Sequence, residues 1–244
     1  MKNPPGQDIY DYGFLRGLFD EMQNTYEAVC TLTSFGFNRR WRRRLVCLMD
    51  LRPGAHVCDL MGGAGETWPY IVRRTGAPGS LTSVDFSPNM TREARRRQGR
   101  HPCQKITVRL EDALDTSICA HSMDAVVCAY GVKTLSGCGR QQFVAEIKRI
   151  LKVGGTFGLV EVSLPPFGPF RRAYLGYLRH VVPVVGKLFL GNPHNYRVLS
   201  TYVTDFRDCR ELEALFAREG FTVSYHSFFW GCATAVVGCA GWSE

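Results

Sequence analysis

The chain lacks a CxxC pair, an internal repeat, a low-complexity stretch and any unbroken apolar run long enough to cross a membrane. A spanning helix needs about 20 mostly apolar residues, and the best candidate is interrupted by Arg179, His180, Pro183 and Lys187. No charged and apolar leader with a small-residue cleavage site opens the sequence, and disulfide frameworks belong to short secreted chains. We therefore expect a cytoplasmic protein with mostly reduced thiols. No spacing of cysteine and histidine indicates a metal site.

Acidic residues are also in short supply. Against 30 Lys and Arg there are 22 Asp and Glu, which gives a net charge of +8 and an isoelectric point near 9.1. Much of the excess lies in two arginine clusters, residues 39–44 around Trp41 and residues 92–100. Such clusters are typical of solvated helix faces, and also of surfaces that attract phosphate or an anionic membrane. Charge alone leaves these interpretations open.

The 244 residues form a pattern of strands alternating with helices of about ten residues, which is typical of a parallel sheet covered on both faces. We expect strands at 56–60, 81–84, 106–110, 125–129 and 156–162, and helices at 66–75, 88–98 and 141–151. Apolar spacing predicts further helices between Tyr10 and Met49, the last covering 40–49 with Asn38 as its cap. The prediction is an α/β, doubly wound, mostly parallel sheet.

One domain spanning 1–244 is expected, in four parts: a helical cap at 10–50, a core at 55–162, an insertion at 164–203 and a closing segment at 204–244. The insertion interrupts the alternation with five prolines and four tyrosines, so we interpret it as a lid. The closing segment predicts a helix at 209–219 and two strands, 221–228 and 233–239, which fit an antiparallel hairpin at the edge of the sheet.

A glycine-rich turn follows the first predicted strand, in the stretch Asp59-Leu60-Met61-Gly62-Gly63-Ala64-Gly65. Glycines at this place let the backbone approach a ligand closely. The next strand ends in Asp85, 20 residues after Gly65, where a carboxylate can accept two hydrogen bonds from a ribose diol. The third strand ends in Glu111-Asp112, where a carboxylate can receive an adenine amine. These features together predict a site for an adenosine-like ligand.

Several segments in order, VCDLMGGAGE, LTSVDFSPNM, LEDA, SMDAVVCAYG and RILKVGGTF, resemble class I S-adenosylmethionine-dependent methyltransferases. LTSFGFNRRWRRRLV, GLVEVSLP, VVPVVGKLFLGN, NYRVL and FFWGCATAVVG extend the resemblance to the ubiquinone/menaquinone C-methyltransferase (UbiE-type) family over nearly the whole chain. The resemblance implies a Rossmann-like sheet of seven strands. It also implies S-adenosyl-L-methionine as cofactor, with S-adenosyl-L-homocysteine as product. The cofactor-binding residues it implies are Asp59, Met61, Gly62, Gly63, Gly65, Asp85, Phe86, Met90, Glu111, Asp112, Ala113 and Tyr130.

The same resemblance implies that a quinol ring with a polyprenyl tail is methylated on carbon, at a site admitted by the lid. Where the family has F-G-[LI]-R-N, this sequence has Tyr130-Gly131-Val132-Lys133-Thr134. We expect Lys133 to supply a base or a positive charge for a phenol-like hydroxyl, because a cation stabilises a phenolate. The other residues expected at the acceptor are Tyr26 and Tyr196 as further catalytic candidates, and Trp41, His194 and Arg197 as binding residues.

Other functions stay open at this point. The change to Lys133-Thr134 favours a natural-product methyltransferase acting on another aromatic or isoprenoid acceptor at C, N or O. A cofactor-binding scaffold without turnover is a further hypothesis, as is a homodimer. A base-flipping N-P-P-[YF] motif and an appended RNA module are both missing, so nucleic acid is not an expected partner. The resemblance to the UbiE-type family implies that the apolar lid and the arginine clusters make peripheral contact with a membrane surface.

Overall fold

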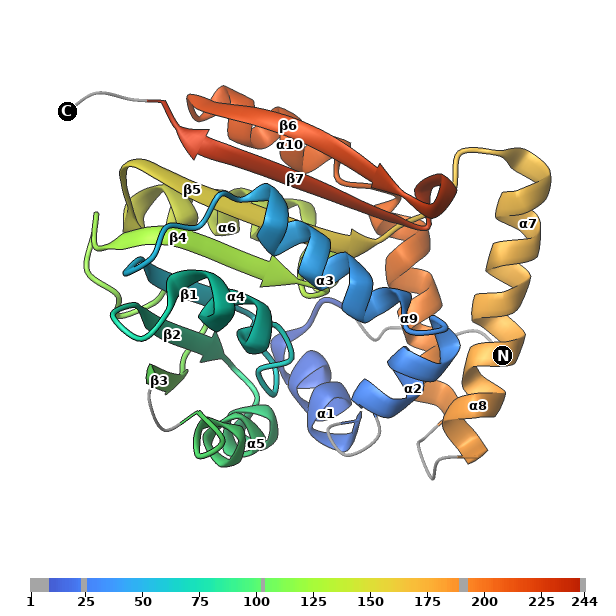
Figure 1. Cartoon of the computed structure of the whole chain (residues 1–244). Coiled ribbons are helices and arrows are strands. Elements are labelled where there is room, and N and C mark those ends of the chain that lie inside the picture. The colour runs from blue at the N-terminus through green and yellow to red at the C-terminus, as the bar shows by residue number, and fades with distance from the viewer. Residues whose placement is uncertain (1–8, 23–25, 102–103, 189–192, 242–244) are drawn as a thin grey trace.

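A single sheet of seven strands forms the centre of the computed structural model, which describes residues 9–22, 26–101, 104–188 and 193–241. For Tyr26 and residues 193–197 only the backbone is described. The strand order is β3-β2-β1-β4-β5-β7-β6 (Figure 1), with β1 to β5 paired in parallel and β7 antiparallel to both neighbours. The expected doubly wound sheet with an antiparallel hairpin at its edge is confirmed. The strands are β1 His56–Leu60, β2 Ser80–Asp85, β3 Lys105–Leu110, β4 Met123–Ala129, β5 Leu151–Val162, β6 Phe221–Phe228 and β7 Ala233–Ala240.

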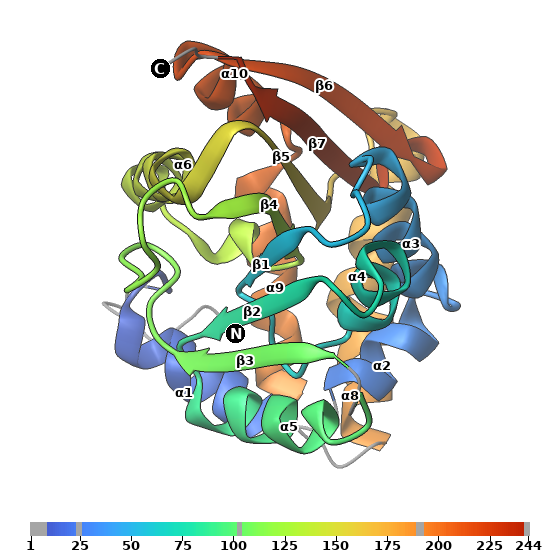
Figure 2. The ribbon, with the colours of Figure 1, turned by 60° about the vertical axis from the view of Figure 1, so that its left-hand side comes forward.

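Helices cover both faces of this sheet (Figure 2), because its central strands are apolar on both sides. On one face, Leu45 and Ile71 belong to a buried cluster that packs α3 (Phe37–Leu48), α4 (Trp68–Thr75) and α5 (Pro88–Gln98) on the strands. On the other, Phe143 and Phe216 anchor α6 (Gly137–Ile150) and α10 (Arg210–Arg218). The result is a three-layer fold in which β1, β2, β4 and β5 all end at the same edge.

A serine N-cap sets the start of two helices, one at its predicted start and one earlier. Helix α5 covers the predicted range 88–98, and the Ser87 hydroxyl at its start accepts a hydrogen bond from the Met90 N–H at 3.1 Å. Helix α6 begins at Gly137, four residues before its predicted start, because Ser136 caps it by accepting from the Gly139 N–H at 3.2 Å. Serine at a helix N-cap satisfies an otherwise unpaired backbone donor.

The N-terminal region contains three helices: α1 (Tyr12–Met22), α2 (Tyr26–Thr33) and α3. The prediction that Asn38 caps the last of them is wrong. Helix α3 starts at Phe37, three residues before its predicted start at 40, and Gly36, with a left-handed φ of 76°, occupies the cap position. Asn38 lies inside the helix and is buried, with its backbone oxygen accepting a hydrogen bond from the Tyr130 hydroxyl at 2.8 Å.

The insertion at 164–203 is mostly helical. It forms α7 (Gly168–Gly176), a π-helical turn η2 (Tyr177–Val181), α8 (Val182–Leu188) and α9 (Pro193–Phe206). Pro169 and Pro193 stand in first helical turns, where a missing N–H breaks no helical hydrogen bond. Pro183 instead lies within a continuous helical run, directly after the π-helical turn η2. These helices pack with α1 and α2 around Met22 and Tyr202. We call α1, α2 and α7 to α9 the helical cap; it stands at the carboxyl end of the parallel strands (Figure 1).

Within the described residues, none of the helices has the length and apolar character needed to cross a membrane.

Candidate functional site

A cavity of about 290 Å³ lies where β1, β2 and β4 end, and α1 closes one side of it. We call it the strand-end cavity. Its walls combine backbone of the glycine turn with carboxylates and apolar side chains. Residues lining it include Tyr12, Phe19, Met61, Gly62, Gly63, Asp85, Phe86, Met90, Asp112, Leu114, Tyr130 and Thr134. Gly65 and Asp59 lie outside this lining.

The glycine turn is bent by left-handed backbone at three places: Met61 with φ 55°, Gly63 with φ 56° and Gly65 with φ 84°. A side chain at Gly65 would place its Cβ 2.6 Å from the ring of Trp68, so only glycine fits between the turn and α4. The Gly63 N–H donates to Asp85 Oδ2 at 2.8 Å. The turn and the end of β2 are therefore one unit, and Gly65 supports that unit from behind.

Asp85 is a buried carboxylate in the wall of the strand-end cavity. Its Oδ2 accepts from Gly63 and its Oδ1 accepts from the Ser87 N–H at 2.9 Å. Burial raises the pKa of Asp85 to about 6, against the lowering effect of these two hydrogen bonds. Each carboxylate oxygen accepts more than one hydrogen bond, so both oxygens keep capacity for a diol. The ribose role of Asp85 stays a prediction that fits this geometry.

Asp59 stands behind the turn, buried at 1% exposure. A Cβ at Gly62 would lie 3.0 Å from Asp59 Oδ2, so this carboxyl supports the turn from beneath. Neither of its oxygens makes a hydrogen bond of ordinary geometry with the described residues. Burial, followed by the charge of Glu66, raises the pKa of Asp59 to about 8, and Arg42 lowers it only in part.

Of the three predicted residues that follow β3, the structure brings one to the cavity. Asp112 lines it and accepts from the Leu114 N–H at 2.9 Å. Glu111 instead turns to Ser117, whose N–H and hydroxyl donate to it at 2.9 and 2.7 Å. Ala113 is buried in the core beneath. Because successive side chains at a strand end point to different sides, two adjacent acids cannot both face one cavity.

Helix α1 contributes residues that sequence motifs did not identify. Tyr12 packs against Phe86 with ring centroids 5.1 Å apart. Asp20 binds the start of α5, accepting from the Ser87 hydroxyl at 2.5 Å and from the Asn89 N–H at 3.3 Å. The apolar spacing of this segment predicted a helix, but no local signal shows that it covers the strand-end cavity.

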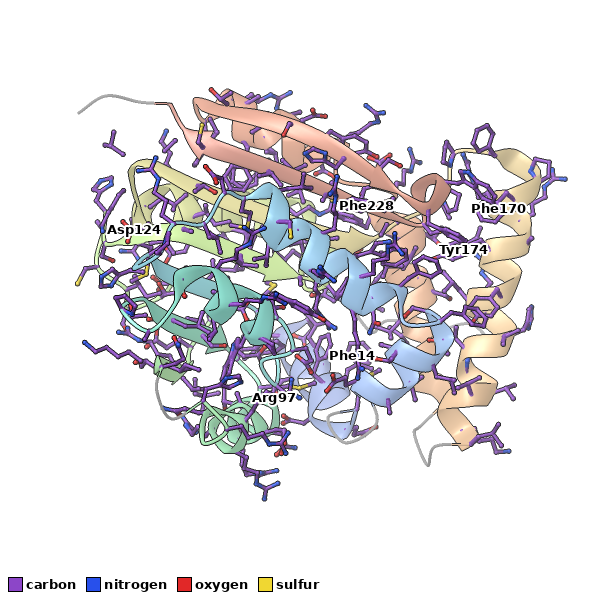
Figure 3. The ribbon with its side chains drawn as sticks, viewed as in Figure 1. Phe14, Arg97, Asp124, Phe170, Tyr174 and Phe228 are labelled. Atoms are coloured by element: carbon purple, nitrogen blue, oxygen red, sulfur yellow. The ribbon has the colours of Figure 1, made fainter. Side chains whose placement is uncertain are left out.

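A second cavity, of about 400 Å³, lies between α3, the end of β5 and the helical cap. We call it the apolar cavity. Its walls include Phe37, Trp41, Phe170, Tyr174, Leu178, Val182, Leu199 and Val203. Figure 3 shows Phe170 and Tyr174 extending from α7 toward the sheet. Exposed aromatic side chains surround its opening: Phe35 and Phe229 line it at 80% and 48% exposure, and Trp230 stacks on Phe229.

Lys133 faces the apolar cavity from the short 3-10 helix η1 (Val132–Thr134). Its ammonium donates to Glu161 Oε1 at 3.0 Å and to the Tyr130 carbonyl at 2.5 Å, and both partners of this ion pair are buried. Lysine has three N–H donors, so one remains for a ligand in the cavity. Glu161, at the end of β5, was not identified from the sequence, although an acid closing an apolar strand is a usable signal.

Trp41 lines the apolar cavity as expected. Tyr130 lies between the two cavities and lines both. Its ring is buried, and burial raises its pKa above the usual value, so the hydroxyl stays protonated and donates to Asn38. The side chains of Tyr26, His194, Tyr196 and Arg197 are outside the described part of the chain, so their roles stay predictions. Among described residues, no three metal-ligating side chains come together.

The sequence profile described as the ubiE/COQ5 methyltransferase family matches residues 9–240. A demethylmenaquinone methyltransferase from Thermus thermophilus is 33% identical over 224 residues, covering 91% of this chain and 99% of that protein. A ubiquinone/menaquinone biosynthesis C-methyltransferase, UbiE, from Geobacter sulfurreducens is 31% identical over 229 residues, covering 93% of this chain and 88% of that protein.

Solved structures agree on the architecture. A SAM-dependent methyltransferase from Aquifex aeolicus superposes with a TM-score of 0.58 at 16% identity, covering 82% of this chain and 89% of the other. Similarity at that level of identity supports the fold alone. The sequence similarity, by contrast, extends over both cavities and the helical cap.

Proposed function

The chain belongs to the ubiE/COQ5 methyltransferase family, and we propose that it methylates a ring carbon of a quinol that carries an apolar tail. It is an S-adenosylmethionine-dependent methyltransferase, as its family and fold require. The observation that carries the proposal is the pair of adjoining cavities, one with carboxylates at strand ends and one apolar with a buried lysine. Relatives named as demethylmenaquinone and ubiquinone/menaquinone methyltransferases support a quinol acceptor.

The strand-end cavity would hold the cofactor. Asp85 is suited to the ribose hydroxyls, Asp112 to the adenine amine, and Phe86 and Met90 to the faces of the adenine ring. The glycine turn leaves its backbone open to close approach. When bound, S-adenosylmethionine supplies a methyl group made electrophilic by its sulfonium sulfur.

The apolar cavity would hold the acceptor. Attack by a ring carbon requires the neighbouring hydroxyl to be ionised or nearly so. The free N–H of Lys133 can donate to that oxygen, and the Glu161 carboxylate keeps the lysine in place. A hydrogen-bond donor aimed at developing negative charge is most effective where water is excluded. The surrounding aromatic and aliphatic walls exclude water and orient the ring for in-line attack.

A membrane surface is the source we propose for the acceptor, with the protein in the cytoplasm and in peripheral contact. The exposed Phe35, Phe229 and Trp230 at the cavity opening are suited to the interfacial zone of a bilayer. Arg40 and Arg44, exposed on α3, the helix that carries Phe37 and Trp41 of the cavity wall, are suited to anionic headgroups. An apolar tail could then pass from the bilayer into the cavity without crossing water.

A natural-product methyltransferase is the second candidate. The observation that favours it is Lys133-Thr134 in place of the family's arginine and asparagine, because arginine and lysine differ in donor geometry. This candidate keeps the same cofactor and the same cavities. It differs only in the aromatic or isoprenoid acceptor and in the atom that is methylated.

The test is to incubate the protein with methyl-deuterated S-adenosylmethionine and a reduced, demethylated naphthoquinone bearing a short prenyl chain, followed by mass spectrometry. We expect a deuterated methyl group on the ring carbon. In parallel, polar and lipid cell extracts serve as acceptor sources. Label in another small molecule would establish the second candidate. Cofactor binding without label in any fraction would contradict both and favour a scaffold.

A further inference from the structure

Arg42 occupies an unusual position in this fold. It projects from α3, is 4% exposed, and stands with its Cζ 4.8 Å from the centroid of the Tyr130 ring. Among the described residues, Arg42 and Tyr130 are the two that line both cavities. The cation and the aromatic ring therefore form the partition between the proposed cofactor site and the proposed acceptor site.

The charge around the apolar cavity is of one sign. Within the described lining its charged side chains are Arg42 and Lys133, and no carboxylate lines it. The Lys133 charge is matched by Glu161, which lies behind it at 3.0 Å. A guanidinium stays protonated at any working pH, and its field is strong where water is excluded. The cavity is thus suited to an apolar molecule that carries one anionic oxygen.

We infer that Arg42 stabilises the ionised hydroxyl oxygen of the acceptor and, with Tyr130, positions the acceptor ring at the junction of the two cavities. This inference rests on the proposed function. In the reaction, the hydroxyl proton leaves to solvent and the ring carbon bonds to the methyl carbon. The carbon–sulfur bond breaks with its electron pair on sulfur, and the ring then loses the hydrogen at the methylated carbon as a proton.

The reacting atoms must meet beside Arg42 and Tyr130, where the two cavities adjoin. In-line transfer needs the two carbons about 3–3.5 Å apart, and the donor and acceptor occupy different cavities that share only these two described residues. Tyr130 is not the base, because its hydroxyl donates to Asn38 and stays neutral. Among the described residues, the other titratable groups near this junction are of two kinds. Cys30 from α2, Glu66 before α4, Lys133 from η1 and Tyr174 from α7 line the cavities, whereas Asp59 in β1 and Glu161 in β5 lie behind the linings.

The experiment uses a nitronaphthol as a chromogenic, unreactive acceptor analogue, because its ionised form absorbs visible light. Its pKa is measured free and bound to the full chain in the presence of S-adenosylhomocysteine. The variants are Arg42→Met, Arg42→Gln and Arg42→Lys, with Arg43→Met as the matched control, since Arg43 is the adjacent arginine on α3 and is exposed. Cofactor affinity is measured by calorimetry on every variant.

We expect the bound pKa to lie at least one unit below the free value in the wild type, which is a tenfold change in ionisation constant. Arg42→Met and Arg42→Gln should remove most of that shift, Arg42→Lys should keep part of it, and Arg43→Met should leave it unchanged. Cofactor affinity should be unchanged in Arg43→Met; because Arg42 also lines the strand-end cavity, the bound pKa of every variant is measured at saturating S-adenosylhomocysteine. If Arg42→Met fails to bind cofactor, Arg42→Gln, which keeps a planar polar group, decides the question.

Two results would overturn the inference. A bound pKa that is equally lowered in wild type and Arg42→Gln would show that Arg42 does not stabilise the oxyanion. So would a shift lost equally in Arg43→Met, because it would reflect the general basic surface. If the analogue does not bind the wild type at all, the proposed function fails with it. If the wild type methylates the quinol while the bound pKa ignores Arg42, only the inference fails.

Discussion

The two cavities are built in different ways. The strand-end cavity is made by a turn and strand termini whose backbone N–H groups hold the key carboxylate, as Gly63 and Ser87 hold Asp85. The apolar cavity is made by side chains from α2, α3, β5 and the insertion, which meet only in the folded chain. One cavity is thus specified by a short stretch of sequence and the other by long-range packing. We expect changes in the first to affect cofactor affinity and changes in the second to affect turnover.

The largest effect should come from Lys133→Met. Removing one donor to a developing oxyanion costs about 10²–10³-fold in turnover, whereas cofactor affinity should stay unchanged because Lys133 is outside the strand-end cavity. Steady-state kinetics and calorimetry measure the two quantities.

Stability needs a control here, because Lys133→Met leaves the Glu161 carboxylate buried and unpaired, at a cost of about 3–5 kcal/mol. The double variant Lys133→Met/Glu161→Gln removes both charges and should recover the thermal stability without recovering turnover. Recovery of turnover in the double variant would mean that the lysine is structural.

The next largest effect should be on membrane binding, when two exposed arginines of α3 are replaced. Each arginine near an anionic surface contributes about 1 kcal/mol, so Arg40→Gln/Arg44→Gln should weaken binding to vesicles containing phosphatidylglycerol by about 30-fold. Turnover on a short-tailed, water-soluble quinol should be unchanged. Sedimentation with anionic vesicles, and with phosphatidylcholine vesicles as control, measures the binding. Equal binding of wild type and double variant would remove the arginines from the membrane proposal.

Asp85→Ala tests the other cavity. Losing the diol contacts should weaken cofactor affinity at least tenfold, about 1.4 kcal/mol, with turnover at saturating cofactor much less affected. Asp115→Ala, an exposed aspartate near the same strand ends, is the control. An unchanged dissociation constant in Asp85→Ala would refute the ribose assignment. A loss of turnover at saturating cofactor would contradict the expectation that changes in the strand-end cavity affect mainly cofactor affinity.

Replacing Asp59 should affect the stability of the folded chain. Its pKa is raised from 3.8 to about 8, so the folded chain keeps a proton that the unfolded chain releases above about pH 4. Stability from this group therefore falls as the pH rises from about 4 to 8. Asp59→Asn should raise the melting temperature of the cofactor-free protein by at least about 5 °C at pH 8.5, where folding buries an ionised carboxylate, and by much less at pH 5. An equal change at both pH values would contradict this origin.

The strand-end cavity could be predicted from the sequence, because the residues that form it belong to short, recognisable segments. The glycine turn and Asp85 lie 20 residues apart, and β1 and β2 are neighbouring parallel strands, so their ends meet. Even here the choice between Glu111 and Asp112 needed the structure, since it depends on which side each adjacent residue faces. The error at Asn38 has another cause: Gly36 occupies the cap position, and the Asn38 side chain, in the first turn, donates to the Thr31 hydroxyl at 3.2 Å.

The apolar cavity could not be predicted from the sequence in the same way. Lys133 and Glu161 are 28 residues apart and pair because β4 and β5 are adjacent. Arg42 belongs to a run of arginines, and only its helical spacing from Leu45 and Val46 distinguishes it from its exposed neighbours. Helical spacing alone did not show that α1 covers the strand-end cavity or that α7 to α9 enclose the apolar one.

The most direct test of this division is a crystal structure with S-adenosylhomocysteine and a short-tailed, demethylated naphthoquinol bound together. We predict the quinol ring next to the cofactor sulfur where the two cavities adjoin, beside Arg42 and Tyr130 and with no side chain between the reacting atoms. A quinol oxygen should lie within hydrogen-bond distance of Arg42 or Lys133, and the tail should lie along the apolar cavity. A quinol bound away from that cavity, or with its ring remote from both cations, would contradict the account.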